Sequence, residues 1–168
     1  PRPWIVAYPG SSRRGSHKRW DPQRLRRALV DLHDRAGGTL LIGWGPAETE
    51  KARALAAELP DAVLLPPTTI RELTLLLGAS GLYVGMDTGP MHLAVLMGTP
   101  AVGVFGRSDP VIHQPAAHLP GRSVAGPDAR EWGSRERRAL PPFTEPAPEA
   151  VVAAALELLA AYPRPRSA

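Results

Sequence analysis

The stretch from Leu82 to Gly106 constrains the fold more than any other part of this 168-residue chain. Its two ends, residues 82–84 and 101–105, are short apolar runs that are typical of buried strands. Between them apolar residues recur at helical spacing, at Met91, Ala94, Val95 and Met97. The pattern predicts a strand, a polar turn, a helix and a second strand, in that order.

The polar turn of this unit is suited to an anion. It contains, in order, Gly85, Asp87, Thr88, Gly89 and Pro90. These residues favour a sharp turn followed by a helix that begins near its proline. A helix N-terminus carries unpaired N–H groups and partial positive charge, so we expect an anion site there. The structural alternative is that Asp87 and Thr88 only cap the helix and that His92 is a packed or solvated histidine.

Strands and helices alternate along most of the chain. Further strands are expected at residues 4–8, 39–42 and 62–65, with one more short strand near 122–125 in the otherwise irregular, proline-rich stretch 107–146. Regular alternation calls for a parallel sheet with right-handed crossovers. We therefore expect the α/β class, with a Rossmann-like parallel sheet of five or six strands and helices on both faces.

The helix boundaries are marked by capping residues. Asp21 and Pro22 predict the start of the first helix, and Gly37-Gly38 predicts its end. The next helix, of about a dozen residues, is expected to stop before Pro60. Thr69-Ile-Arg-Glu72 forms a capping box for the third helix, and a last helix is expected over residues 149–162.

The length fits one domain, which we place at residues 1–162 and follow with a tail at 163–168. There are no cysteines, which agrees with a reducing compartment. The longest apolar run, residues 150–162, is shorter than the roughly 20 residues that span a bilayer. We therefore expect a soluble, cytoplasmic protein. Because the chain begins with Pro1 rather than methionine, we also expect it to be a piece of a longer protein.

Arginines cluster at residues 13–27 and 130–138, and the formal net charge is +4. Such clusters could bind nucleic acid, an anionic membrane surface or a phosphorylated ligand. The simpler interpretation is that arginine replaces lysine in this composition. Each cluster contains a single tryptophan, Trp20 or Trp132, which is too few for a stacking platform, so no nucleic-acid partner is expected. His113 and His118 have no carboxylate or cysteine at ligand spacing, and no metal site is expected either.

The loops that follow the strands should meet at one rim of the sheet, where ligands of such folds bind. Hydroxyls and a lysine suit phosphate oxygens, and a carboxylate suits the donors of a ribose diol. Residues of these types follow the first four strands, which predicts a nucleoside diphosphate site. The candidate residues are Ser11, Ser12, Lys18, Glu48, Thr68, Asp87, Thr88, Gly89 and His92, with Glu50 as an alternative to Glu48.

The sequence Asp87-Thr-Gly-Pro-Met-His92, followed by Gly98-Thr-Pro100 and Phe105-Gly106, resembles the signature of the heptosyltransferase-type glycosyltransferases, family 9. Pro9-Gly-Ser-Ser12 with Lys18-Arg-Trp20 resembles the phosphate loop of that family, and Gly45-Pro-Ala-Glu48 resembles its ribose-binding turn. The resemblance implies the C-terminal, nucleotide-sugar-binding half of an enzyme with two Rossmann-like domains, the GT-B architecture.

The resemblance also implies a function. The domain would bind a nucleotide-sugar, most plausibly ADP-heptose, for transfer to a glycolipid acceptor in lipopolysaccharide or cell-surface glycan synthesis. Lys18 and the helix that begins near Thr88 would offset the charge on the leaving diphosphate, without a metal or other cofactor. The acceptor site and the catalytic base would lie on a missing N-terminal domain, so this chain alone should be inactive. The resemblance also allows a peripheral position of the enzyme at the inner face of the membrane.

Two alternatives remain at this level. One is a free-standing nucleotide-binding module without transferase activity, and the other is a fragment of a GT-B-type sugar-nucleotide epimerase. An in-frame Rossmann-like half upstream, with a glycine-rich first loop, would favour the transferase. A native start codon near Pro1 would favour the module.

Overall fold

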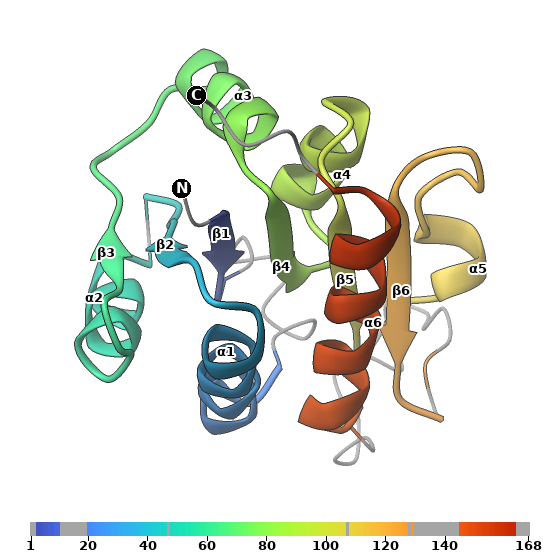
Figure 1. Cartoon of the computed structure of the whole chain (residues 1–168), viewed down its shortest axis with the longest axis horizontal. Helices are drawn as coiled ribbons and strands as arrows, with labels where there is room; N and C mark the ends of the chain where they lie inside the picture. The colour runs from blue at the N-terminus through green and yellow to red at the C-terminus, as the bar shows by residue number, and fades with distance from the viewer. Residues whose placement is uncertain are drawn as a thin grey trace, which may run out of the picture.

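The computed structural model describes residues 3–10, 20–46, 48–106, 108–127, 129 and 145–163. These residues form a sheet of six parallel strands in the order β3-β2-β1-β4-β5-β6 (Figure 1). The strands are β1 (Trp4–Tyr8), β2 (Thr39–Ile42), β3 (Val63–Leu64), β4 (Leu82–Met86), β5 (Ala101–Phe105) and β6 (Gly121–Ala125). The predicted parallel sheet is confirmed, and the strand before the polar turn lies in its middle.

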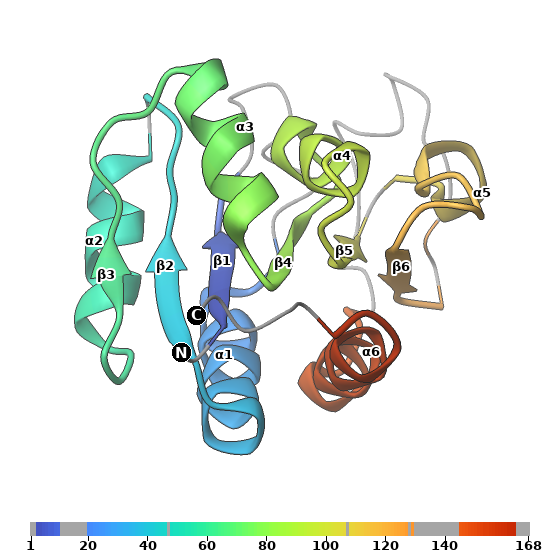
Figure 2. The same ribbon diagram turned by 45° about the horizontal axis from the view of Figure 1, so that its top comes forward.

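Helices cover both faces of the sheet, as predicted. They are α1 (Pro22–Ala36), α2 (Thr49–Ala57), α3 (Ile70–Ala79), α4 (Gly89–Leu96), α5 (Pro110–His113) and α6 (Pro148–Ala161). Figure 2 shows α3 and α4 on one side of the sheet and α1 with α6 on the other. Each face has its own buried apolar cluster, one including side chains of α1, α2 and α6 and the other side chains of α3 and α4.

Three local expectations were wrong. The third strand has two residues rather than the four of 62–65, because it is an edge strand and Pro66-Pro67 begins two residues after its end. The second helix stops before Pro60 as expected, but it has 9 residues rather than about a dozen and ends at Ala57. The four-residue helix α5 was not predicted; it lies in the stretch that we expected to be irregular.

The predicted helix caps are confirmed. The Asp21 carboxylate accepts hydrogen bonds from the backbone N–H groups of Gln23 (2.9 Å) and Arg24 (3.0 Å) at the start of α1. Gly37, with a φ of 66°, ends that helix. At α3 both hydrogen bonds of the Thr69–Glu72 capping box are present.

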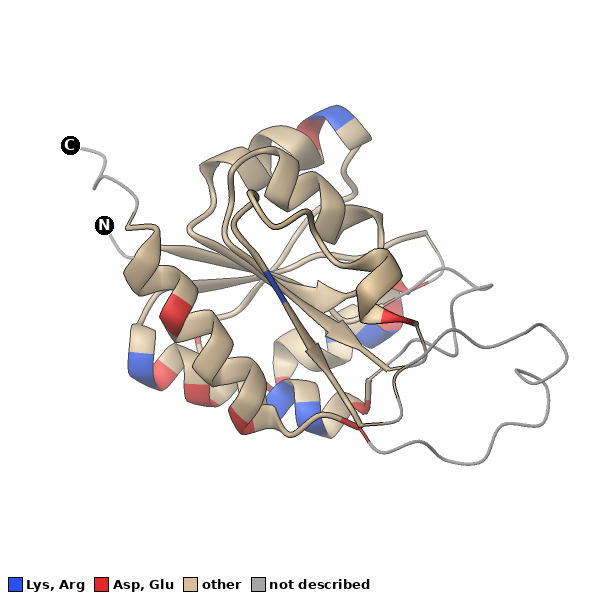
Figure 3. Cartoon of the chain, turned by 90° about the vertical axis from the view of Figure 1, so that its right-hand side faces the viewer, with Lys and Arg blue, Asp and Glu red and all other residues tan. Residues whose placement is uncertain are grey.

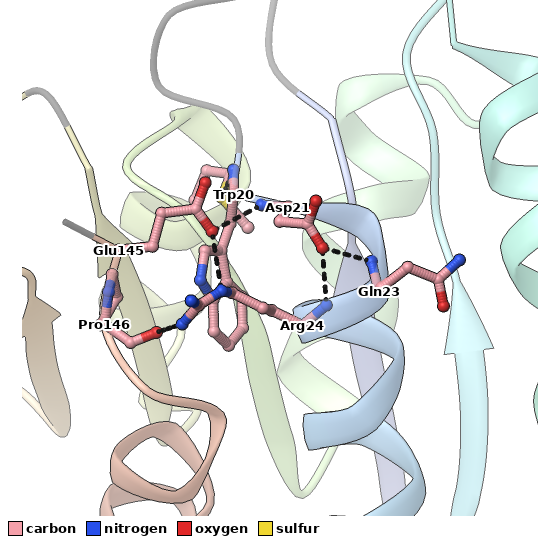
Figure 4. A network of polar contacts seen from close by, with 7 residues as sticks. Trp20, Asp21, Gln23, Arg24, Glu145 and Pro146 are labelled. Carbon is pink, nitrogen blue, oxygen red and sulfur yellow. Dashed lines mark hydrogen bonds and ion pairs between the residues drawn. The ribbon is translucent and has the colours of Figure 1, made fainter. Parts of the chain in front are cut away.

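The start of α1 is also tied to the start of α6 by a polar network (Figure 4). Glu145 Oε2 accepts a hydrogen bond from the Asp21 backbone N–H (3.1 Å) and lies 3.4 Å from Arg24 Nε. Arg24 Nη1 also donates to the carbonyl oxygen of Pro146 (3.4 Å). The two outer helices of this face are therefore held together at their N-terminal ends.

The Asp21→Ala variant should lose about 1 kcal/mol of unfolding free energy, because two N–H groups of α1 lose their acceptor. Asp21→Asn should retain most of the stability, since asparagine caps about as well as aspartate. Asp34→Ala is the matched control on the same helix, because Asp34 is exposed and does not cap. Urea unfolding measures all three, and equal stability of Asp21→Ala and Asp34→Ala would contradict the capping role.

Most charged residues of the described part of the chain lie on helices and in loops (Figure 3). The strands carry one charged residue, the exposed Arg122 on the edge strand β6. On α1, Arg24 and Arg27 pair with Glu145 and Glu149. This pairing favours the simpler interpretation of the arginine cluster as far as the structure describes it. No helix in the described part of the chain is long and apolar enough to cross a membrane.

Candidate functional site

The strand order reverses between β1 and β4, which is where Rossmann-like sheets form a ligand crevice at the carboxyl ends of their strands. Tyr8, the last residue of β1, is paired with Gly85 near the end of β4. Six candidate residues follow β2, β3 and β4 at this end of the sheet, namely Glu48, Thr68, Asp87, Thr88, Gly89 and His92. The other three candidates, Ser11, Ser12 and Lys18, lie outside the described residues. Their role in binding phosphate stays a prediction.

Asp87 is buried directly after the central strand β4. Its side chain is 4% exposed, and its Oδ1 lies 3.4 Å from Nε2 of His92, whose side chain is 44% exposed. Its backbone N–H donates to the carbonyl oxygen of Val104 on β5 (3.3 Å). The Asp87 carboxylate is therefore fixed between the sheet and a histidine at the mouth of the site.

The helix N-terminus beside Asp87 is open. Thr88 is the N-cap of α4, but its side chain makes no capping hydrogen bond and instead donates from Oγ1 to the carbonyl oxygen of Met86 (3.3 Å). A Cβ atom added to Gly89 would have no neighbour within 4 Å. The Thr88 side chain therefore does not cap the helix, while the structural alternative for Asp87 and His92 stays open. The anion site expected at the first turn of α4 stays a prediction.

Glu48 points from the start of α2 back toward the loop after β1. The residue is 7% exposed, and a Cβ atom added to Gly10 would lie 1.9 Å from its Oε2. The backbone N–H of Glu48 donates to the carbonyl oxygen of Gly45 (2.9 Å). The alternative residue, Glu50, has a side chain that is 88% exposed and lies near Arg53. The structure thus places Glu48, and not Glu50, beside the β1 loop.

Two tyrosines that sequence reasoning missed lie beneath these turns. The rings of Tyr8 and Tyr83 are stacked, with centroids 6.2 Å apart and an interplanar angle of 29°. Burial raises the pKa of Tyr8, and its hydrogen bond with the Thr68 side chain partly opposes this shift. The tyrosine pair therefore connects the end of β1 to the loop after β3 and to the centre of the sheet.

Glycines make room for this pair. Gly85 and Gly103 are partners on β4 and β5, and Gly43 directly follows β2. A Cβ atom would lie 2.1 Å from Cε2 of Tyr8 at Gly43, 2.4 Å from the Tyr83 hydroxyl at Gly85, and 2.2 Å from Met91 Sδ at Gly103. The three glycines thus allow large side chains to lie flat against the sheet near its carboxyl end.

No group of three or more metal-ligating side chains occurs among the residues that the structure describes. The expectation of a metal-independent site stays a prediction. What the geometry offers is a buried carboxylate next to the β1 loop, an aspartate–histidine pair, and an open helix N-terminus.

Comparison with known proteins identifies the family. Residues 1–126 match the model of glycosyltransferase family 9 (heptosyltransferase). Lipopolysaccharide heptosyltransferase 1 of Pseudomonas aeruginosa is 33% identical over 94 residues, which is 55% of this chain and 26% of the relative. Lipopolysaccharide heptosyltransferase 3 of Escherichia coli is 28% identical over 128 residues, which is 72% of this chain and 36% of the relative.

Solved structures of glycosyltransferases have a similar fold. A family 9 glycosyltransferase of Veillonella parvula superimposes with a TM-score of 0.79 over 95% of this chain and 47% of its own, at 20% identity. The E. coli heptosyltransferase WaaC with ADP gives a TM-score of 0.66 at 25% identity, over 74% of this chain and 38% of its own. This chain thus spans less than half of each of these relatives. The resemblance carried by the Asp87–His92 motif is confirmed, and the chain belongs to glycosyltransferase family 9, the heptosyltransferase family.

Proposed function

We propose that this chain is the donor-binding domain of a GT-B glycosyltransferase that uses ADP-heptose in lipopolysaccharide or cell-surface glycan synthesis. The similar WaaC enzyme has been solved with ADP and with ADP-2-deoxy-2-fluoro heptose, which supports an ADP-sugar as the donor. The coverage of the relatives supports a second domain elsewhere in the enzyme.

One observation carries the proposal: Glu48 and the Asp87 turn lie on either side of the point where the strand order reverses. A nucleoside diphosphate has a diol at one end and an anion at the other. Glu48 supplies acceptors for the ribose hydroxyls, and the open N-terminus of α4 supplies N–H groups and partial positive charge for the diphosphate. The two features have the chemical complementarity that such a ligand needs.

In this proposal the domain binds and stabilises but supplies no catalytic base. Transfer of the sugar leaves a diphosphate on which negative charge develops, and the α4 N-terminus, together with Lys18, offsets that charge. The glycolipid acceptor and the base belong to the N-terminal domain. The enzyme works in the cytoplasm, peripheral to the inner face of the membrane, without a metal or other cofactor.

The isolated chain should bind ADP weakly and transfer no sugar. Half of the cleft is absent, so the ligand loses contacts, and ordering of the site on binding lowers the affinity further. Isothermal calorimetry with ADP, UDP and GDP tests the binding and the choice of base. A transfer assay with ADP-heptose tests the second part, and robust turnover by this chain would refute the division of labour between the domains.

A matched pair of variants sharpens the binding test. Glu48→Gln should weaken ADP binding about tenfold, because a charged acceptor for the ribose becomes neutral. Glu50→Gln removes the same charge two residues away, on an exposed side chain, and should leave the affinity unchanged. Equal affinities for the two variants would remove Glu48 from the site.

A further inference from the structure

The Tyr83 hydroxyl is a buried polar group that the proposed function has not used. Tyr83 is 0% exposed, and its hydroxyl makes no hydrogen bond of acceptable geometry with any described residue. A buried hydroxyl without a partner costs free energy that a phenylalanine at the same position would avoid. The position of this group therefore calls for an explanation.

Strand geometry aims the hydroxyl at the proposed anion site. Tyr83 and Gly85 lie on the same face of β4, and the ring runs along the strand so that its hydroxyl lies over Gly85. The stacked ring of Tyr8 holds it from the other side. The end of this rigid pair therefore lies beneath the turn that begins at Asp87.

Thr88 is the polar side chain beside the hydroxyl. Burial strongly raises the pKa of Tyr83, and the neighbouring Thr88 side chain is the main influence that lowers it. The two groups are thus neighbours, and the Tyr83 hydroxyl has no hydrogen-bond partner among the described residues. The single proton of Thr88 Oγ1 is directed to the carbonyl oxygen of Met86 at a long 3.3 Å.

We propose that Tyr83 is a positioning residue for the phosphate site, whose hydroxyl donates to Thr88 Oγ1 when Thr88 donates its own proton to a bound diphosphate. This inference rests on the proposed function. A threonine hydroxyl has one proton and two lone pairs, so it can donate to the ligand while it accepts from tyrosine. A charged acceptor at the end of this chain strengthens both hydrogen bonds. The Tyr83 hydroxyl, which has no hydrogen-bond partner among the described residues, thus gains one on binding.

The test is ADP binding by calorimetry together with thermal melting of the full chain. Tyr83→Phe should weaken ADP binding by about three- to tenfold, the loss of one ordinary hydrogen bond. Its melting temperature should stay the same or rise, because an unpaired buried hydroxyl is removed. A merely structural tyrosine would move affinity and melting temperature in the same direction or leave affinity unchanged.

Two further variants test whether Tyr83 acts through Thr88. Thr88→Val should weaken ADP binding, and adding Tyr83→Phe to it should have no further effect, because Tyr83 acts through Thr88. Tyr162→Phe is the matched control, since Tyr162 is exposed at the end of α6, and it should change neither measurement.

The outcomes separate this inference from the proposed function. ADP binding by Tyr83→Phe at the affinity of the unaltered chain would overturn the inference alone. An equal effect of Tyr83→Phe with and without Thr88→Val would overturn the route through Thr88. Failure of the unaltered chain to bind ADP at all would overturn the proposed function, and this inference with it.

Discussion

Replacing Asp87 with asparagine should weaken ADP binding by roughly 1.5–3 kcal/mol, the range for a hydrogen bond to a charged group, while the melting temperature barely moves. The carboxylate is buried beside His92, and in the proposed function it accepts hydrogen bonds from the sugar or ribose hydroxyls. A direct contact with the diphosphate is not expected, because like charges repel. Calorimetry and a melting curve on the same samples measure both quantities.

Asp109→Asn is the matched control for this variant. Asp109 is the N-cap of α5, and its carboxylate accepts a hydrogen bond from the Val111 backbone N–H (2.8 Å). Asparagine caps about as well as aspartate, so this change should alter neither stability nor binding. If Asp87→Asn behaves in the same way as Asp109→Asn, Asp87 is not part of the site, and the anion site rests on Thr88 and Gly89 alone.

Gly85→Ala should destabilise the domain by about 2 kcal/mol through overpacking. The new Cβ atom would lie 2.4 Å from the Tyr83 hydroxyl, 2.8 Å from Cζ of the same ring and 3.1 Å from the Tyr8 carbonyl oxygen. Neither the stacked rings nor the paired strand backbone can move away at low cost. Urea unfolding should show a lower midpoint with an unchanged slope.

Gly89→Ala makes the same chemical change but should have the opposite effect on the stability of the domain. A Cβ atom there has open space, and alanine restricts the unfolded chain, so the domain should become more stable by about 0.5 kcal/mol. Combining Gly85→Ala with Tyr83→Phe should restore part of the lost stability, because the atom nearest the new Cβ is removed. Equal stability of Gly85→Ala and the unaltered chain would contradict the close packing of the tyrosine pair.

The elements that could be predicted from sequence are those with local causes. The cap at Asp21 and the capping box at Thr69 depend on residues within one helical turn, and both are confirmed. The apolar runs of β1, β4 and β5 are long enough to identify as strands. Convergence of the loops at one rim follows from parallel topology, which places Glu48 and Asp87 at the same end of the sheet.

What could not be predicted depends on contacts between distant parts of the chain. Stacking of Tyr8 on Tyr83 requires the β1–β4 register, which no local pattern encodes. The proximity of Glu48 to Gly10 likewise arises only when β1 and β2 are paired. The length of β3 is limited by its position at the sheet edge. Gly43 after β2 and Gly85 on β4, if the register were known, would have been the signal for the buried rings.

The β1–β4 ladder has a consequence for how the domain could come apart. Together with the packing of α1 against α6, it joins a half containing β1, β2 and β3 to a half containing β4, β5 and β6, and each half is continuous in sequence. Glu48 belongs to one half and Asp87 to the other. A ligand that contacted both residues would connect the two halves. Its binding free energy would therefore add to the free energy needed to separate them. Local separation of the two halves would release the ligand and disrupt the folded domain at the same time.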